Sequence, residues 1–256
     1  MPKSITSIRI TAVLAAAAAL YGSSLACDSI PFLAPTATPT STSTPSPTAT
    51  PTVTPTRTVF PIPSDIGWPV YFSDSFDDQR NNWFVGDYSD PYVSGTASIT
   101  GGKYLIDFTA KGPFSWWPSP TKKLEDFYLS VEVTRIECPK ACDYGLVFRY
   151  RGNDQYIFTI NVDHQDYRVM VYAGGEWTTL IDFTESSQIA ADSANQIAVK
   201  AEGVKFTFFI NGEVVNQIEN DVLDAGRAGV GLMSYRAGDH AVLEFDNFEV
   251  RAPEAD

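Results

Sequence analysis

Three acidic residues near the C-terminus have the types and spacing that come closest to a catalytic group. Glu244, Asp246 and Glu249 lie together in the stretch EFDNFE. Retaining hydrolysis of a glycosidic bond requires two carboxyl groups about 5–5.5 Å apart, one as nucleophile and one as acid and base. If the phenylalanines of this stretch face a core, a β-bulge near Asp246 would turn Glu244 and Glu249 to the same side. These two glutamates are therefore candidate catalytic residues.

Two cysteines, Cys138 and Cys142, are separated by three residues in ECPKACDYG. In an exported chain a short-loop disulfide is the first interpretation. A zinc site would need further ligands, and the spacing is not that of a Cys-x-x-Cys redox pair. His164 and His240 are isolated, and the sequence contains no nucleophilic triad, phosphate loop or zinc spacing. We therefore expect a structural disulfide.

The first 26 residues have the order of a secretory signal. Lys3 and Arg9 supply basic charge, residues 10–21 are almost entirely apolar, and small residues precede Cys27. The apolar run is too short to span a bilayer, which needs about 20 residues. This pattern predicts export, to the cell surface or beyond.

The segment Ser24-Leu25-Ala26-Cys27 resembles the end of a bacterial lipoprotein signal. The resemblance implies that Cys27 is lipidated and begins the mature chain. Two acyl chains on Cys27 would anchor the protein stably in a membrane. The alternative is ordinary cleavage at the same bond, which leaves a free thiol.

Composition divides the rest of the chain. Residues 27–65 are dominated by Thr, Ser and Pro and have too little apolar surface to fold, so they predict a disordered linker, glycosylated or plain. Residues 66–252 predict one folded domain, and residues 253–256 a disordered tail. The chain of 256 residues carries a net charge of −13, which argues against binding to nucleic acid or to anionic lipid.

The domain reads as short strands. Segments such as KYLIDFTA, QYIFTINV and VKFTFFIN alternate apolar and polar residues, and Gly-Gly or Asn-Gly pairs separate several of them. No helical periodicity lasts for more than two turns. The pattern predicts an all-β, two-sheet antiparallel sandwich of a dozen or more strands.

The order of segments across residues 71–250 resembles the concanavalin A-like lectin and glucanase jelly roll, with laminin G-like and 3-keto-disaccharide hydrolase-like modules as nearer relatives. The segments that carry this resemblance are FSDSFDDQRNNW, GGKYLIDF, YGLVFRYRGNDQYIFTI, GEWTTLI, FFINGEVV, AGVGLMSY and VLEFDNFEV. It implies one convex and one concave sheet, with any sugar bound on the concave side. The fold hosts lectins, glycosidases and inert adhesion modules alike, so it does not by itself assign a function.

The alternation of apolar and polar residues along three predicted strands indicates candidate ligand-binding residues. If Leu146, Phe148, Ile160 and their neighbours form the core, one open face would carry Arg149, Thr159, Asn161, Arg168 and Tyr172. The 3-keto-disaccharide hydrolase-like modules imply the same role for Arg149, in the pair Phe148-Arg149. Trp117 is a further candidate, because flat aromatic rings stack on sugars. We expect Trp83 and Trp177 to be structural. The alternative is a solvated polar face without a ligand.

The EFDNFE stretch also fits the laminarinase-type pattern Glu-x-Asp-x-x-Glu. In those enzymes the pattern lies mid-domain on a concave strand, whereas here it falls on the last strand, so we interpret it as non-catalytic. Jelly rolls of this kind often hold calcium near the first and last strands, and Asp74 and Asp246 are candidate oxygen ligands. The alternative for both residues is a hydrogen-bonded turn aspartate.

These observations favour a surface-tethered, non-catalytic module whose ligand is a carbohydrate and which needs no cofactor beyond structural calcium. The runner-up is a glycan-active enzyme that uses Glu244 and Glu249 or a site around Arg149. The third hypothesis is an adhesion module with a protein partner.

Overall fold

A computed structural model describes residues 60–64, 66–140 and 142–254 of the chain. These residues form fifteen β-strands and contain no α-helix. The strands are β1 (Val70–Asp74), β2 (Gly86–Ser89), β3 (Val93–Thr100), β4 (Lys103–Ala110), β5 (Phe114–Trp116), β6 (Phe127–Glu137), β7 (Cys142–Arg151), β8 (Asp154–Asn161), β9 (Asp166–Ala173), β10 (Glu176–Glu185), β11 (Asn195–Glu202), β12 (Lys205–Ile210), β13 (Glu213–Glu219), β14 (Arg227–Ser234) and β15 (His240–Arg251).

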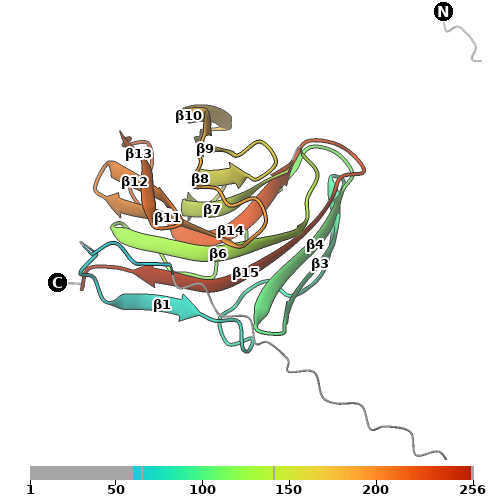
Figure 1. Cartoon of the computed structure of the whole chain (residues 1–256), viewed down its shortest axis with the longest axis horizontal. Helices are drawn as coiled ribbons and strands as arrows, with labels where there is room; N and C mark the ends of the chain where they lie inside the picture. The colour runs from blue at the N-terminus through green and yellow to red at the C-terminus, as the bar shows by residue number, and fades with distance from the viewer. Residues whose placement is uncertain (1–59, 65, 141, 255–256) are drawn as a thin grey trace, which may run out of the picture. The chain divides into compact units, whose positions relative to one another are not determined.

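The strands form two antiparallel sheets packed face to face, which confirms the predicted sandwich. A nine-stranded sheet has the order β13-β12-β11-β6-β15-β4-β3-β2, with β1 paired to β15, and a six-stranded sheet has the order β10-β9-β8-β7-β14-β5. Figure 1 shows β7 to β10 in one layer and β6, β15, β4 and β3 in the other. The first strand pairs with the last, as the jelly-roll resemblance predicted.

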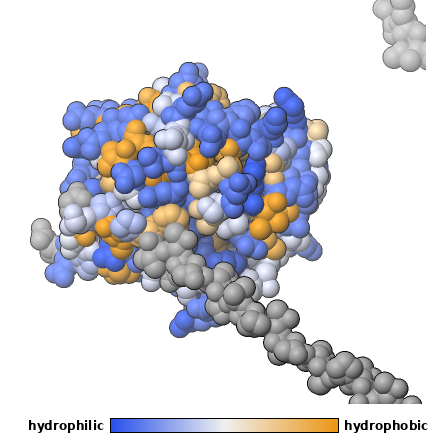
Figure 2. Space-filling model, in the orientation of Figure 1, coloured by the Kyte–Doolittle hydropathy of each residue, from blue (hydrophilic) through white to orange (hydrophobic). Residues whose placement is uncertain are grey.

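The core lies between the inner faces of the two sheets. Phe148 and Phe158 of the six-stranded sheet meet Phe206 and Phe208 of the nine-stranded sheet, with ring centroids 5.0–6.4 Å apart in three of these pairs. All four rings are fully buried. Burying one such side chain contributes about 1.5–3 kcal/mol. On the face shown in Figure 2 hydrophilic residues predominate, with hydrophobic residues in patches between them.

The segment before the first strand packs on the outer face of the nine-stranded sheet. Ile66 is buried there against Tyr128, Ala198 and Phe209, and Trp68 completes this small cluster. Further upstream, the side chain of Pro61 lies so close to Gly212 that a Cβ at this glycine would approach it to 3.0 Å. The chain therefore enters the domain across the back of this sheet.

Cys138 and Cys142 form a disulfide that closes the turn between β6 and β7, as predicted from the sequence. Within the described ranges, no helix is long and apolar enough to cross a membrane.

Candidate functional site

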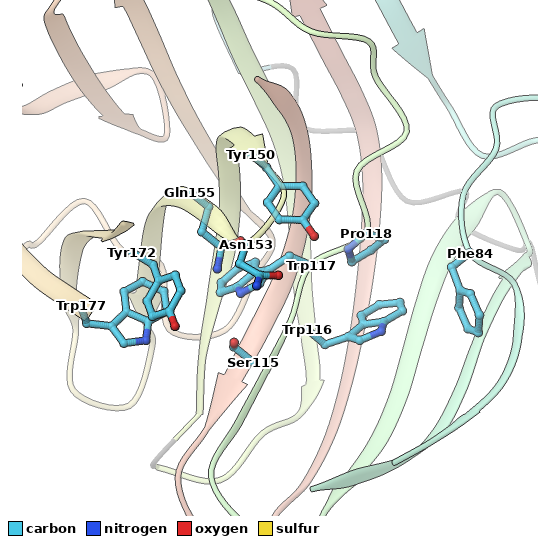
Figure 3. A pocket seen from close by; sticks show the side chains of 10 residues that line it. All are labelled: Phe84, Ser115, Trp116, Trp117, Pro118, Tyr150, Asn153, Gln155, Tyr172 and Trp177. Carbon is cyan, nitrogen blue, oxygen red and sulfur yellow. The ribbon is translucent and has the colours of Figure 1, made fainter. Parts of the chain in front are cut away.

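An aromatic groove of about 560 Å³ runs over the outer face of the six-stranded sheet (Figure 3). Its floor and walls come from β5, β7, β8, β9 and β10, together with the loop that precedes β2. The lining residues are Phe84, Ser115, Trp116, Trp117, Pro118, Tyr150, Asn153, Gln155, Tyr172 and Trp177. None of these side chains carries a formal charge, and six of them are aromatic.

One end of the groove is formed by the β9–β10 hairpin. The turn Gly174-Gly175, with both residues at positive φ, pairs Tyr172 directly with Trp177. Their ring centroids are 5.1 Å apart, and Trp177 remains 38% exposed. Figure 3 shows these two rings together at one end of the groove and Phe84 at the other. The prediction that Trp177 is structural is wrong, because the hairpin register places it beside Tyr172 on the open face.

A β-bulge near the end of β7 overturns the predicted position of Arg149. Regular pairing with β8 stops at Phe148 and resumes at Arg151, and Arg149 has a φ of +49°. The bulge reverses the faces on which these two side chains lie. Tyr150 reaches the groove, whereas Arg149 turns away from it. Arg149 therefore does not share the open face with Arg168 and Tyr172, and the role implied by the Phe148-Arg149 pair has no geometric basis.

The buried Arg149 guanidinium holds three chain segments together. Nη1 donates to the carbonyl of Leu223 at 2.8 Å, and Nη2 donates to the carbonyls of Glu125 and Gly203 at 2.9 and 2.6 Å. The side chain is only 2% exposed, and burial lowers the pKa of its guanidinium. Its partners are backbone oxygens, so its role is structural.

Glycines in β14 allow the segment around Trp117 to lie flat on the sheet. A Cβ at Gly231 would fall 2.0 Å from the carbonyl oxygen of Trp116 and 2.6 Å from the Trp117 ring. A Cβ at Gly229 would fall 1.9 Å from the carbonyl oxygen of Pro118. The indole nitrogen of Trp117 is buried and has no hydrogen-bond partner within the described residues. Trp117, a predicted ligand-binding residue, lines the groove.

A polar network around Arg168 lies on the same face of the six-stranded sheet. Nη2 of Arg168 lies 2.8 Å from Oδ2 of Asp143, and the Tyr235 hydroxyl donates to the same oxygen at 2.9 Å. Asn161 donates to Oδ1 of Asp143 at 3.0 Å. Burial raises the pKa of the Asp143 carboxyl and lowers that of the Arg168 guanidinium, while the ion pair opposes both shifts. These contacts fix the position of Arg168.

The remaining two predicted ligand residues lie on this face but are covered. Thr159 is almost completely buried, and its hydroxyl has no hydrogen-bond partner within the described part of the chain. Asn161 is buried and also donates to the carbonyls of Lys140 and Cys142. Alternation predicted their face correctly. Neither residue lines the groove.

Sequence reasoning missed several residues that line the groove. The alternation of Leu146 and Phe148 predicts that Tyr150 faces the core, because alternation takes no account of a bulge. Asn153 lies in the tight turn between β7 and β8, Gln155 lies in β8, and both contribute carboxamides to the groove. The Gly174-Gly175 turn was a usable signal for Trp177, because a two-residue hairpin fixes which residues pair.

The two candidate catalytic glutamates lie on the other sheet. The expected bulge is present: Asn247 has a φ of +50°, and the pairing of β15 with β6 shifts between Asp246 and Glu249. Glu244 and Glu249 therefore both point outward from the nine-stranded sheet, and Glu249 accepts a hydrogen bond of 2.6 Å from Nε of Arg251. This position lies on the sheet opposite the aromatic groove.

The two predicted calcium ligands have partners within the chain. Asp246 pairs with the Lys103 ammonium. Asp74 accepts hydrogen bonds from the backbone of Phe76 at 2.7 Å, from Asn81 at 2.9 Å and from the Trp83 indole at 2.8 Å. No group of three or more His, Cys, Asp or Glu residues within the described ranges is arranged to hold a metal ion. Calcium at these aspartates stays a prediction.

Several predictions concern residues outside the described ranges. The signal at residues 1–26, the lipidated Cys27, nearly all of the linker at 27–65 and the last two residues of the tail belong to this group.

The two stacked sheets, with the first strand paired to the last, define the domain as a concanavalin A-like jelly roll. Several solved structures share this fold at low sequence identity, and the likeness establishes the fold alone. The carbohydrate-binding module CBM66 from Bacillus subtilis has a TM-score of 0.50 at 16% identity, covering 62% of this chain and 92% of that chain.

Two glucanases are also similar. A Bacillus licheniformis β-glucanase has a TM-score of 0.54 at 12% identity, covering 71% of this chain and 97% of its own. SCLam, a non-specific endo-β-1,3(4)-glucanase of family GH16, has a TM-score of 0.55 at 11% identity, covering 76% of this chain and 94% of its own. No family model matches the chain, and no curated protein matches its sequence.

Proposed function

We propose that this domain binds a glycan, without cleaving it, in the aromatic groove of the six-stranded sheet. The observation that carries the proposal is the lining of the groove, where six aromatic residues, two of them exposed, lie with the carboxamides of Asn153 and Gln155. Aromatic rings offer flat apolar faces to a sugar ring, while carboxamides both donate and accept hydrogen bonds with its hydroxyls. A concave site with many apolar walls and few polar groups is the usual form of a ligand-binding pocket.

The positions of the carboxylate side chains relative to the groove favour binding over hydrolysis. Retaining and inverting glycosidases both need two carboxyl groups beside the scissile bond. The ten residues that line the groove include no aspartate or glutamate. Glu244 and Glu249 belong to a strand of the opposite sheet.

A glycan array with the purified domain tests this proposal. We expect binding to at least one class of polysaccharide. Replacing Trp177 with alanine should weaken that binding by at least about tenfold, because aromatic side chains supply much of the binding energy at many recognition sites. The matched control is Tyr92→Ala, because Tyr92 is 59% exposed and does not line the groove.

Three results would count against the proposal. Failure to bind any glycan would refute it. Equal binding by the Trp177→Ala and Tyr92→Ala variants would place the site elsewhere. If the domain hydrolyses a β-glucan and Glu249→Gln abolishes this activity, the domain is an enzyme rather than a binding module.

We further propose that the domain is displayed at the cell surface, tethered through lipidated Cys27 and the Thr/Pro-rich linker. The sequence of residues 1–65 supports this proposal. Mass spectrometry of the mature N-terminus should detect acyl chains on Cys27. The Cys27→Ala variant should be recovered from the medium rather than the membrane fraction. A mature N-terminus without a lipid would contradict the anchor.

A further inference from the structure

A second hollow adjoins the aromatic groove on the same face of the sheet. This side pocket has a volume of about 430 Å³ and shares Ser115 and Trp177 with the groove, so one ligand can occupy both. Its apolar walls come from Phe114, Met170 and Met233, together with the ring of Tyr235.

Arg168 is the only charged residue that lines the side pocket. Its guanidinium is held between two rings, 4.8 Å from the centroid of Phe183 and 5.4 Å from that of Tyr235, and the residue is 9% exposed. Nη2 pairs with Asp143, whereas Nε is buried and has no hydrogen-bond partner within the described residues. The guanidinium is therefore held in a fixed position beside the apolar wall, with Nη2 also 3.7 Å from Sδ of Met233.

The surrounding charges favour a neutral ligand group over an anion. Asp143 pairs directly with the guanidinium, and the charges of Asp166 and Asp182 also favour its charged form. An added carboxylate or sulfate would meet the repulsion of these three carboxylates. The arginine guanidinium has only hydrogen-bond donors, so its ligand must supply an acceptor. A neutral carbonyl oxygen is such an acceptor and carries no charge for the three carboxylates to repel.

We propose that the side pocket binds an acetyl substituent of the glycan. The methyl group packs against the thioether side chains of Met170 and Met233, and the carbonyl oxygen accepts a hydrogen bond from Arg168. This inference rests on the proposed function, because the sugar ring that carries the substituent lies in the aromatic groove beside Trp177. The acetyl group can be an N-acetyl or an O-acetyl substituent, since both present the same methyl and carbonyl.

Paired glycans with and without acetyl groups test the inference. Chitin oligosaccharides and their N-deacetylated counterparts form one pair. An O-acetylated polysaccharide, before and after mild alkaline treatment that removes only the ester, forms the other. We expect the wild-type domain to bind the acetylated member of one pair about tenfold more tightly, because one charged hydrogen bond and one buried methyl group are added. The pair that responds identifies the linkage.

Two variants connect this preference to the side pocket. Met170→Phe fills the pocket, and Arg168→Lys keeps a charge opposite Asp143 but removes the forked donors. Either change should lower the ratio of the two affinities to about one. The Tyr92→Ala variant should keep the ratio of the wild-type domain. Thermal unfolding of each variant checks that it is folded.

The outcomes separate the two proposals. Equal affinity of the wild-type domain for both members of every pair overturns the acetyl inference and leaves glycan binding intact. A preference that survives in both Met170→Phe and Arg168→Lys also overturns it. Absence of binding to all of these glycans, and to the array, overturns the proposed function and this inference together.

Discussion

The Arg149 guanidinium lies 4.8 Å from the centroid of the Phe206 ring, on the core side of β7, while the next residue, Tyr150, lies in the groove. Two consecutive side chains on opposite sides are ordinary in a strand. Here their sides are reversed relative to the alternation of the preceding residues, because the bulge after Phe148 shifts the register. The same local irregularity thus builds part of the core and part of the groove.

Replacing Arg149 with alanine should strongly destabilise the fold. The substitution leaves the carbonyls of Leu223, Glu125 and Gly203 without their donor, and each buried unpaired group costs about 1–3 kcal/mol. We expect urea unfolding to show a loss of at least about 3 kcal/mol. The matched control is Arg151→Ala: its ion pair with Asp224 is exposed and screened by solvent, so its loss should change stability far less. Equal losses in the two variants would contradict the structural role of Arg149.

Replacing Gly231 with alanine should damage the groove. The new methyl group would collide with the backbone of Trp116 and the ring of Trp117, so the segment must move off the sheet. Overpacking of this kind costs about 1–3 kcal/mol. We expect a lower unfolding temperature and weaker glycan binding. The corresponding change at Gly67, where a Cβ would contact nothing within 4 Å, should leave both unchanged. Full affinity in Gly231→Ala would show that the position of Trp117 is unimportant.

Removing the disulfide should have a modest effect on stability. The Cys138–Cys142 bond closes a short loop, for which the loss of chain entropy in the unfolded state corresponds to about 2 kcal/mol. The double variant Cys138→Ser/Cys142→Ser should therefore unfold at a lower urea concentration than the oxidised wild-type domain. Addition of a reductant should lower the wild-type midpoint toward that of the variant and leave the variant unaffected. A reductant effect of equal size on both proteins would mean that the bond is not its cause.

Stability should depend on pH through His240. Its ring lies 2.8 Å from Asp107 and 3.2 Å from Glu137, and the hydrogen bond with Asp107 is the largest of the contacts that raise the pKa of His240. A raised pKa favours the protonated folded state. This stabilisation is complete below the unfolded value of about 6.5 and is lost as the pH rises through the raised pKa.

The measurement for His240 is the unfolding temperature of the wild-type domain and of His240→Gln across this pH range. The wild-type domain should be the more stable at low pH, and the difference should shrink as the pH rises above about 7. A difference that grows with pH would reverse the sign and contradict the assignment. His164, which is about half exposed and lies 3.9 Å from Asp166, supplies the comparison variant His164→Gln.

Alternation and turn residues predicted the sandwich because both report directly on strand geometry. The Asn211-Gly212 turn joins β12 to β13, and alternate apolar residues of β7, β8 and β9 face the core, whereas Val147 and Ile157 lie on the outer face. Even the bulge near Asp246 followed from the sequence, because Phe245 and Phe248 cannot both be buried without one.

The groove was harder to predict, because it depends on contacts between segments that are distant in the sequence. The sequence around Phe148 contains no signal for a bulge. The bulged conformation of Arg149 is stabilised by hydrogen bonds from its side chain to carbonyls of three other segments. Trp117 faces the open side because glycines in β14 leave room for its segment, and a strand pattern does not identify which strand will be its neighbour. Arg168 was assigned to the correct face, but its ion pair with Asp143 joins two strands that are not adjacent in the sheet.

The approach of the chain to its first strand has a consequence for how the domain meets a polymer. Residues 61–68 cross the back of the nine-stranded sheet, and the aromatic groove opens on the opposite side of the sandwich. This described segment therefore lies on the sheet opposite the groove. A long polysaccharide bound as proposed above would therefore not meet residues 61–68.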